Sequence, residues 1–352
     1  MSLQNPSGMA EAKPTTAPAT PVSLPAGTPG IRVVPPSVPF RDVMAGASRH
    51  EVKVLDHGFI ALVDAMPRLV PEGQTADQAI VQAARVSYGE GTKQVSEDRG
   101  LIRYLMRHRH STPFEMVEFK FHVSMPIFIA RQWIRHRTAN VNEYSARYSI
   151  VPDRFYIPTM EAVRRQSASN RQGGEQNFDV SDAAQVKTAE DFLAYVGQVE
   201  SLYQQYLALT AQGVSREMAR IGLPVNVYTE WYWKCDLHNV MRFLSLRLDS
   251  HAQLEIREYA AAMLSLIEPL VPMTVEAWRD YEFESMRLTR LEIEAIRRSG
   301  AGAGGEGAGE VGDLATSNRR EQAEWAAKRS VLGLGEVSLP SPTGGKAKPE
   351  GV

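Results

Sequence analysis

Basic side chains are concentrated in the segment from Arg103 to Arg154. Few carboxylates accompany them there, and several histidines lie in the same segment. Arginine guanidiniums match the oxygens of phosphates and carboxylates, so the segment predicts a site for multiply anionic ligands. The alternative is a solvated basic face that pairs with acids elsewhere in the fold. The basic residues are Arg103, Arg107, Arg109, Lys120, Arg131, Arg135, Arg137, Arg147 and Arg154.

Two short patterns inside this segment favour ligand binding over a solvated face. Arg135 and Arg137 are two positions apart at a predicted helix end, so their side chains point in different directions and suit two phosphates. The run NEYSAR at 142–147 combines amide, carboxylate, hydroxyl and guanidinium groups. Such a set of donors and acceptors suits a ribose, a base edge and a phosphate.

Nucleophilic and metal chemistry have weaker support. Cys235 is the single cysteine, which excludes an intramolecular disulfide and any multi-cysteine metal site. It follows a run of aromatic residues and has no base in an evident activating pattern, so we predict a buried small side chain and not a nucleophile. His108, His110 and His136 lack the spacing and the cysteine partners of common zinc sites, and no metal is predicted.

The basic segment is predicted to lie on a helix, a strand and a second helix. Apolar spacing from Ser96 predicts a helix that ends in the RHRH run at 107–110. Alternation over Val117–Val123 predicts a half-buried strand. Ser124 and Pro126 then predict the start of a helix with one cationic face.

The second half of the core is predicted to be mainly helical. An amphipathic helix is expected over 190–212, followed by a short helix capped by Ser215. Alternation over Val225–Trp233 predicts a second strand, and apolar spacing from Leu237 to Leu248 predicts another helix. The SHAQ run at 250–253 has the pattern of a capping box and predicts a further helix start. The expected fold is α+β or α/β, with long helices packed on a small antiparallel or mixed sheet.

Composition divides the chain into three parts. Residues 1–48 are crowded with proline and small residues, which predicts a disordered arm. Residues 49–298 are predicted to form a single catalytic domain. Residues 299–352 begin with a glycine-rich run and are predicted to be a linker and flexible tail, with a short helix over Glu321–Leu332.

Charge and hydropathy argue against several classes of protein. The formal net charge is −2, which argues against a chain whose main role is to coat nucleic acid. There is no run of about 18 apolar residues and no signal-peptide pattern, so neither a membrane span nor secretion is predicted. With one cysteine, the expected compartment is the cytoplasm.

Three ordered motifs resemble one known family. The RHR run at 135–137, then seven residues, then Ser145 is similar to the signature of flavin-dependent thymidylate synthases. The signature extends here as NEYSARYS to Ser149. HSTPFE at 110–115 with ARQW at 130–133 resembles the family's segment before the signature.

The third motif, FLSLRLDSHAQLEI at 243–256, resembles the family's C-terminal segment. The similarity covers about 52–281 and implies that family's fold. It also implies methylation of dUMP to dTMP, with 5,10-methylenetetrahydrofolate as carbon donor, FAD as hydride carrier and NADPH as reductant. No cysteine nucleophile is implied. The family works as a homotetramer with active sites shared between subunits, so we expect the same assembly here, without nucleic-acid or membrane partners.

Site residues follow from the resemblance by position. Arg247 is implied to be catalytic, because its fixed positive charge favours the N3-deprotonated, electron-rich pyrimidine that attacks the methylene carbon. The residues implied to bind dUMP are Gln132, Ile134, Arg135, Glu143, Tyr144, Ser145, Ala146, Arg147, Arg220 and Arg247. The residues implied to bind FAD are His110, Thr112, Arg135, His136, Arg137, Glu143, Asp236, His238, Arg242 and His251.

The chain departs from the family pattern at two places. Asn140 stands where many members have serine, and DLH at 236–238 stands where some members have Asn-x-Arg. Two other functions remain open from the residues alone. One is a nucleic-acid-binding module that uses the basic 103–154 segment, and the other is a metallohydrolase built on the histidines.

Overall fold

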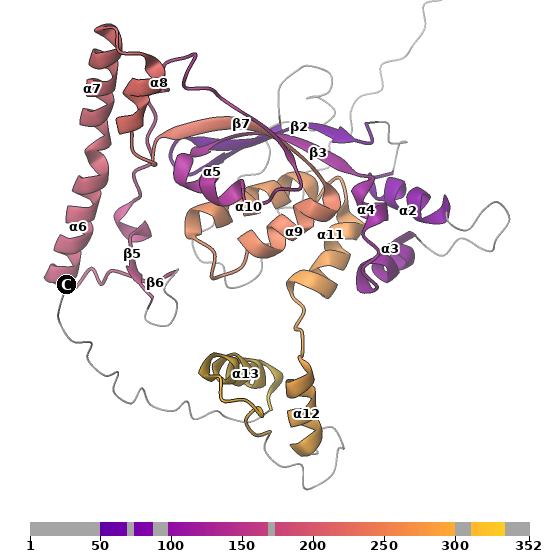
Figure 1. Ribbon diagram of the computed structural model, residues 1–352. Coiled ribbons are helices and arrows are strands. Elements are labelled where there is room, and N and C mark those ends of the chain that lie inside the picture. The colour runs from indigo at the N-terminus through magenta and orange to yellow at the C-terminus, as the bar shows by residue number, and fades with distance from the viewer. Residues whose placement is uncertain (1–49, 69–73, 87–97, 168–172, 300–310, 335–352) are drawn as a thin grey trace, which may run out of the picture. The chain divides into compact units, whose positions relative to one another are not determined.

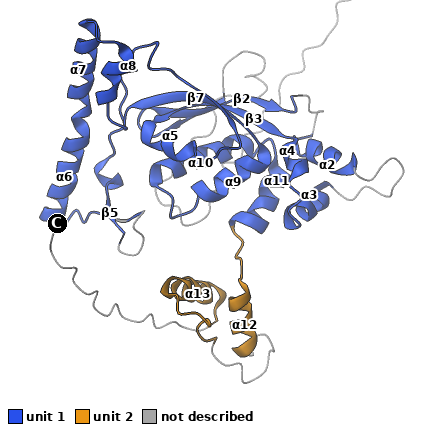
Figure 2. Cartoon of the chain, in the orientation of Figure 1, with its two compact units in different colours: residues 1–283 blue, residues 284–352 orange. Residues whose placement is uncertain are grey.

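The structure, a computed structural model, describes residues 50–68, 74–86, 98–167, 173–299 and 311–334. The chain forms two compact units, residues 1–283 and 284–352, which Figure 2 shows in different colours. The arm predicted over 1–48 lies outside the described residues, as does the end of the predicted tail.

A five-stranded antiparallel sheet is the centre of the first unit, with the strand order β1-β2-β3-β7-β4. Phe119, Phe121 and Val123 are fully buried on one face of β3, whereas the polar residues between them are partly exposed. The alternation predicted for this strand is therefore confirmed. The strands are β1 His50–Val54, β2 Gly58–Met66, β3 Glu118–Pro126, β4 Asn140–Glu143 and β7 Tyr228–Asp236.

Three helices pack against this sheet and enclose an aromatic core. They are α5 Ile127–Trp133, α9 Leu237–Arg247 and α10 Leu254–Ile267, and Figure 1 shows α9 and α10 on one side of the strands. Trp133 stacks on Phe243 with 4.6 Å between ring centroids and meets Trp233 edge-on at 5.7 Å. Burial of these rings supplies the main apolar stabilisation and fixes the ends of α5 and α9 against β7.

A helical group beside the sheet consists of α2 Asp77–Val86, α3 Asp98–Arg107, α4 Thr112–Glu115, α11 Pro272–Trp278 and the short π-helix η3 Arg279–Phe283. Asp77 is fully buried and joins α2 to α11. Its carboxylate accepts hydrogen bonds from Met273 N at 3.0 Å and from Thr274 Oγ1 at 2.6 Å. The helix predicted from Ser96 is α3, which places the RHRH run at its end.

The remaining elements of the first unit follow β4 and precede β7 in the sequence. They are η1 Met160–Ala162, β5 Arg164–Gln166, β6 Gly174–Asn177, α6 Ala183–Gly197, α7 Val199–Ala211, α8 Arg216–Ala219 and η2 Arg220–Gly222. The single helix predicted over 190–212 is divided at Gln198, where α6 ends and α7 begins. Tyr203 and Tyr206 attach α7 to the segment that follows β4, because both hydroxyls hydrogen-bond to the backbone of Val151.

Two predicted helix starts are wrong. Ser124 does not cap α5, since it is buried inside β3 and Pro126 is the N-cap. The capping box predicted at 250–253 does not form either, because α10 begins after Gln253 without a side-chain cap. The carboxylate of Asp249 instead accepts from the backbone N–H of His251 at 2.8 Å and holds a turn there.

The second unit contains α12 Arg290–Ser299 and α13 Arg319–Leu332. Trp325 is fully buried and packs with Ala295, Val311 and Leu314. The short helix predicted over Glu321–Leu332 is thus present within α13. The unit boundary, however, lies before α12 and not at the predicted 298, because α12 shares its apolar core with α13.

Candidate active site

Arg247, the last residue of α9, contacts the RHR segment. Its Nε donates to His136 Nε2 at 3.0 Å, and its Nη2 donates to the carbonyl oxygen of Gln132 at 3.2 Å. The guanidinium therefore hydrogen-bonds both to the end of α5 and to the middle residue of the RHR run. Two parts of the chain that are far apart in sequence meet at this one side chain.

His136 is neutral in this arrangement. Burial, followed by the positive charges of Arg247 and Arg242, lowers the pKa of His136 to about 4. A neutral imidazole can accept through Nε2, so the hydrogen bond from Arg247 places the ring proton on Nδ1. The ring also meets Phe243 edge-on at 4.9 Å, which fixes its orientation. Burial lowers the pKa of Arg247 as well, yet an arginine stays charged at neutral pH.

A cavity of about 340 Å³ opens at this point, and we call it the Arg247 cavity. Its lining is rich in guanidiniums and contains no carboxylate among the described residues. Such a lining attracts anions, since each arginine offers several N–H donors in a fixed plane. The lining residues are Arg135, His136, Arg137, Thr138, Trp233, Cys235, Asn239, Arg242, Leu246 and Arg247.

Cys235 reaches the cavity wall but is not activated. Its Sγ donates to the carbonyl oxygen of Thr138 at 3.1 Å, and burial raises the pKa of the thiol. A thiol held protonated is a poor nucleophile. The prediction that Cys235 is buried is confirmed, and a raised thiol pKa agrees with the expectation that it is not a nucleophile.

The predicted dUMP residues at the end of β4 and in the loop after it lie outside the Arg247 cavity. Glu143 is exposed, and its Oε1 accepts from Thr229 Oγ1 at 2.8 Å. Tyr144 OH donates to the carbonyl oxygen of Ile150 at 2.7 Å, which closes the loop that holds Ser145 and Ala146. Arg147 is exposed, and its Nε lies 3.9 Å from Glu217.

The predicted flavin residues are also divided. Arg135, His136, Arg137 and Arg242 line the Arg247 cavity, whereas His110, Thr112 and His238 do not. The carboxylate of Asp236 caps α9 and accepts from Asn239 N at 2.9 Å. That bond gives Asp236 a structural role at the start of the helix that ends in Arg247.

Three further predicted residues, Arg220, Ile134 and His251, also lie outside the Arg247 cavity. Arg220 is exposed in η2, after α8, which packs against α7 (Figure 1). Ile134 is the C-cap of α5 and is partly exposed. His251 lines a second cavity together with Gln253, whose side-chain oxygen accepts from Gln132 Nε2.

Sequence reasoning missed Asn239, Thr138 and Leu246 as cavity residues. Two of them could have been found from spacing, because Asn239, Arg242 and Leu246 follow one another at helical intervals of three and four. Thr138 directly follows the RHR run and carries the carbonyl that binds Cys235.

Other kinds of site have little support in the described residues. Over the described ranges, no group of three or more histidine, cysteine, aspartate or glutamate side chains is arranged to hold a metal ion. Nor does any helix in those ranges combine the length and the apolar character that a bilayer crossing requires.

Comparisons of this chain with known proteins all point to one family. Residues 68–273 match the family model described as thymidylate synthase complementing protein. A protein of Dictyostelium discoideum named flavin-dependent thymidylate synthase is 60% identical over 302 residues, 86% of this chain and 94% of that protein. One of Gluconobacter oxydans with the same name is 53% identical over 250 residues, 71% and 79% of the two chains.

Solved structures agree with this match. The UMP/dUMP methylase PolB from Streptomyces cacaoi, bound with 5-Br dUMP, is 33% identical with a TM-score of 0.54. The matched region covers 65% of this chain and 97% of PolB. The sequence motifs, the sheet with its helices and these relatives lead to one conclusion: this chain belongs to the thymidylate synthase complementing protein family, whose relatives above are flavin-dependent thymidylate synthases.

Proposed function

We propose that this protein is a flavin-dependent thymidylate synthase that converts dUMP to dTMP. The carbon comes from 5,10-methylenetetrahydrofolate, and NADPH supplies the reducing electrons. When bound, FAD would carry these electrons as a hydride. The observation that carries the proposal is the guanidinium-lined Arg247 cavity in a chain of this family.

The donor set of the Arg247 cavity is compatible with a nucleotide or flavin phosphate. Arg135, Arg137 and Arg242 offer charged N–H donors, and Asn239 offers an amide. Trp233 supplies an apolar wall. A cavity of about 340 Å³ is near the lower end of small-molecule sites, so it suits part of one ligand and not all of them together.

Arg247 is suited to stabilise negative charge on the pyrimidine. Its bonds to His136 and Gln132 use Nε and one Nη2 hydrogen, so further N–H groups of the guanidinium can face a ligand. Half-burial strengthens the interaction with an anion, because the local dielectric is lower than that of water. In this proposal Arg247 favours the N3-deprotonated ring, which makes C5 nucleophilic toward the methylene carbon.

We further propose that the complete site is assembled between subunits of a homotetramer. Arg147 and Arg220 are exposed, and neither lines the Arg247 cavity of its own chain. A second copy could present its loop after β4 and its η2 turn to this cavity. The dUMP and FAD residues implied by the resemblance are retained as proposals on this basis, with methylenetetrahydrofolate and NADPH as small-molecule partners.

We also propose a cytoplasmic location, which suits the single reduced cysteine.

One experiment separates this function from the two alternatives. Purified full-length protein is expected to show flavin absorption bands and to form dTMP from dUMP only when methylenetetrahydrofolate and NADPH are both present. The variant Cys235→Ala is expected to retain this activity, because the thiol is protonated and bonded to Thr138. A colourless protein that takes up no added FAD and makes no dTMP would refute the proposal. Salt-sensitive oligonucleotide binding or stoichiometric zinc would then favour the corresponding alternative.

A further inference from the structure

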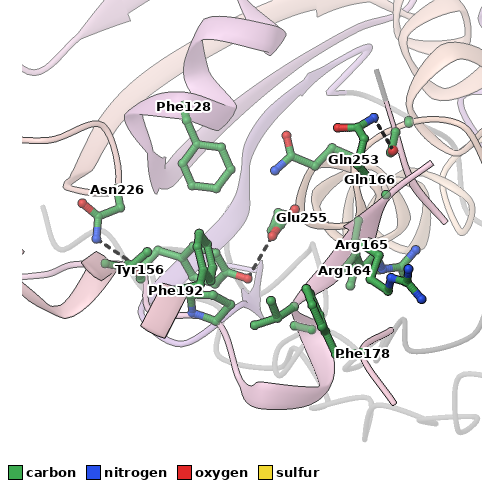
Figure 3. Close-up of a pocket in the computed structure, with 18 of the residues that line it drawn as sticks. Phe128, Tyr156, Arg164, Arg165, Gln166, Phe178, Phe192, Asn226, Gln253 and Glu255 are labelled. Carbon is green, nitrogen blue, oxygen red and sulfur yellow. Dashed lines mark hydrogen bonds between the residues drawn. The ribbon is translucent and has the colours of Figure 1, made fainter. Parts of the chain in front are cut away.

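A second cavity of about 640 Å³ lies beside the β5–β6 hairpin, and we call it the hairpin cavity. Its lining comes from the hairpin, from α5 and α6, from the segment between β4 and η1, from the loop before β7 and from the start of α10. Figure 3 shows Phe128, Tyr156 and Phe192 toward one side of the view, and Arg164 and Arg165 toward the other. The volume is within the usual range for a small-molecule site. Of the residues implied above to bind dUMP or FAD, His251 is the one that lines this cavity among the described residues.

One end of the hairpin cavity is aromatic. Phe128 and Tyr156 lie 5.8 Å apart between ring centroids, at a tilted angle. Phe192, on α6, lines the cavity and keeps 41% of its surface exposed, which is high for a phenylalanine in a folded unit. Aromatic faces left open to a cavity favour a flat, conjugated group as the occupant.

The other end contains arginines that are incompletely hydrogen-bonded. The Nε atoms of Arg164 and of its neighbour Arg257 are buried and have no hydrogen-bond partner among the described residues. Arg257 is only 4% exposed. Burial lowers the pKa of Arg257, and the charge of Arg164 lowers it further, so the two guanidiniums repel each other. An anion placed beside Arg164 would relieve that repulsion.

The acidic group in the lining does not cancel this charge. Glu255 is the one carboxylate among the described lining residues. It accepts a hydrogen bond from Tyr156 OH at 3.1 Å and also interacts electrostatically with Arg257. Arg165 interacts electrostatically with Asp182, so Arg164 remains as the main group that an incoming anion would meet.

Two local features place Arg164 and relate the hairpin cavity to the Arg247 cavity. A Cβ on Gly174 would lie 2.7 Å from the Cβ of Arg164, so glycine at this position allows β6 to approach β5 closely. Gln253, in the lining, accepts from Gln132 Nε2, and the carbonyl of Gln132 accepts from Arg247. One pair of glutamines thus separates the hairpin cavity from the candidate catalytic arginine.

We propose that the hairpin cavity binds the anionic portion of a co-substrate, with Arg164 pairing with its carboxylate or phosphate and Phe128, Tyr156 and Phe192 contacting a flat ring. The inference rests on the proposed function, because that function requires two ligands of this chemistry. Methylenetetrahydrofolate has carboxylates on an aromatic body, and NADPH has phosphates between ring systems. Both present the same features to the cavity, and kinetics can distinguish them.

The test is steady-state dTMP formation by the full-length flavin-loaded enzyme and its variant Arg164→Gln, with dUMP, methylenetetrahydrofolate and NADPH varied in turn. Loss of one charged hydrogen bond is expected to raise KM for one co-substrate about tenfold, with KM for dUMP unchanged. Arg164→Lys should raise the same KM less, because a point charge remains. Arg290→Gln, which removes an exposed charge in the second unit, is the control and should change no KM.

Each outcome has a defined meaning. A selective rise for methylenetetrahydrofolate assigns the cavity to a carboxylate tail, and a selective rise for NADPH assigns it to a phosphate. Phe192→Leu should then raise the same KM. The melting temperature of Arg164→Gln should not fall, since the variant removes a repulsion with Arg257. Unchanged KM values in an active enzyme overturn this inference and leave the proposed function standing, whereas absence of dTMP formation by the wild type contradicts the proposed function itself.

Discussion

Arg247 combines a structural contact and a chemical role in one side chain. Its bond to a neutral His136 requires that the guanidinium carry the charge and the imidazole carry none. The charge therefore faces whatever ligand enters the Arg247 cavity. Because His136 orients the guanidinium plane, the geometry of the fork and not only the charge is expected to matter.

The variant Arg247→Lys tests this point. It is expected to retain flavin and to lose about 100-fold in kcat, because an ammonium cannot bond His136 and a ligand oxygen with the same fork geometry. Flavin content is measured by absorbance and turnover by dTMP formation. Arg290→Lys, at an exposed pair with Glu294, is the matched control. Wild-type turnover in Arg247→Lys would remove Arg247 from the mechanism.

Glu230 makes a separate, pH-dependent contribution to stability. It accepts from His122 Nε2 at 3.1 Å and from Arg154 Nη2 at 2.6 Å. The bond with His122 is the largest cause that lowers the pKa of Glu230, to about 2. For a carboxyl whose folded pKa is depressed, the stabilisation is present above the ordinary pKa and is lost as the pH falls toward the folded value.

Glu230→Gln should therefore be less stable than the wild type by about 1 kcal/mol at pH 7, after allowance for partial exposure. The difference should shrink as the pH falls from about 4.5 toward 2. Thermal unfolding at a series of pH values measures it. Asp191→Asn, which breaks an exposed pair with Lys187, should show little difference at any pH. A gap for Glu230→Gln that stays constant down to low pH would contradict the assigned ion pair.

At the scale of elements, the start of β2 packs closely against α10 at Gly58. A Cβ on Gly58 would lie 2.0 Å from Tyr259 Oη and 2.7 Å from the carbonyl oxygen of Val54. Tyr259 is fully buried and donates to the carbonyl of Ser124 at 2.8 Å, so it cannot move aside easily. Glycine at this position lets α10 approach the sheet edge.

Gly58→Ala is consequently expected to destabilise the protein by about 3 kcal/mol, through overpacking against the backbone and Tyr259. Gly100→Ala is the matched control, because nothing lies within 4 Å of its would-be Cβ in α3. That change should stabilise by about 0.5–1 kcal/mol, since alanine is the better helix former. Urea unfolding midpoints compare the two variants. Equal stability of Gly58→Ala and the wild type would show that this contact can relax.

At the scale of the whole molecule, the described residues form one large apolar core and two smaller ones. The large one surrounds the aromatic group at Trp133 and borders the Arg247 cavity. One small core surrounds Tyr203 and Tyr206 in the first unit, and the other surrounds Trp325 in the second. The family match ends at residue 273, before the second unit begins. We therefore expect the catalytic chemistry to belong to the first unit.

A chain that ends at Phe283 is expected to fold, to take up FAD and to form dTMP at the wild-type rate, because it retains the large core and both cavities. Flavin absorbance and dTMP formation are the measurements. Thermal unfolding of this shortened chain should remain cooperative. A colourless or inactive product would mean that the second unit contributes to the site.

The sequence by itself determined much of this protein. The period of two over Val117–Val123 and the helical spacing from Leu237 to Leu248 were sufficient for β3 and α9, because local periodicity reports which face is buried. The RHR motif, the NEYSAR run and the segment around Arg247 were sufficient to indicate the family. The chemistry of arginine and the absence of a base near Cys235 indicated anion binding without a thiolate.

The tertiary structure decided what local patterns cannot report. Arg247 meets His136 across 111 positions of sequence, and no periodicity encodes such a contact. Asp236 caps α9 because its carboxylate accepts from Asn239 N, and Ser124 belongs to β3 because it pairs with Phe59 of β2 and Glu230 of β7. The charge at one end of the hairpin cavity depends on Arg164 and Arg257, whose Nε atoms have no hydrogen-bond partner among the described residues and which meet only after β5 packs near α10. Long-range packing selects these contacts among many that the sequence allows, because each is stable only when the surrounding core has closed.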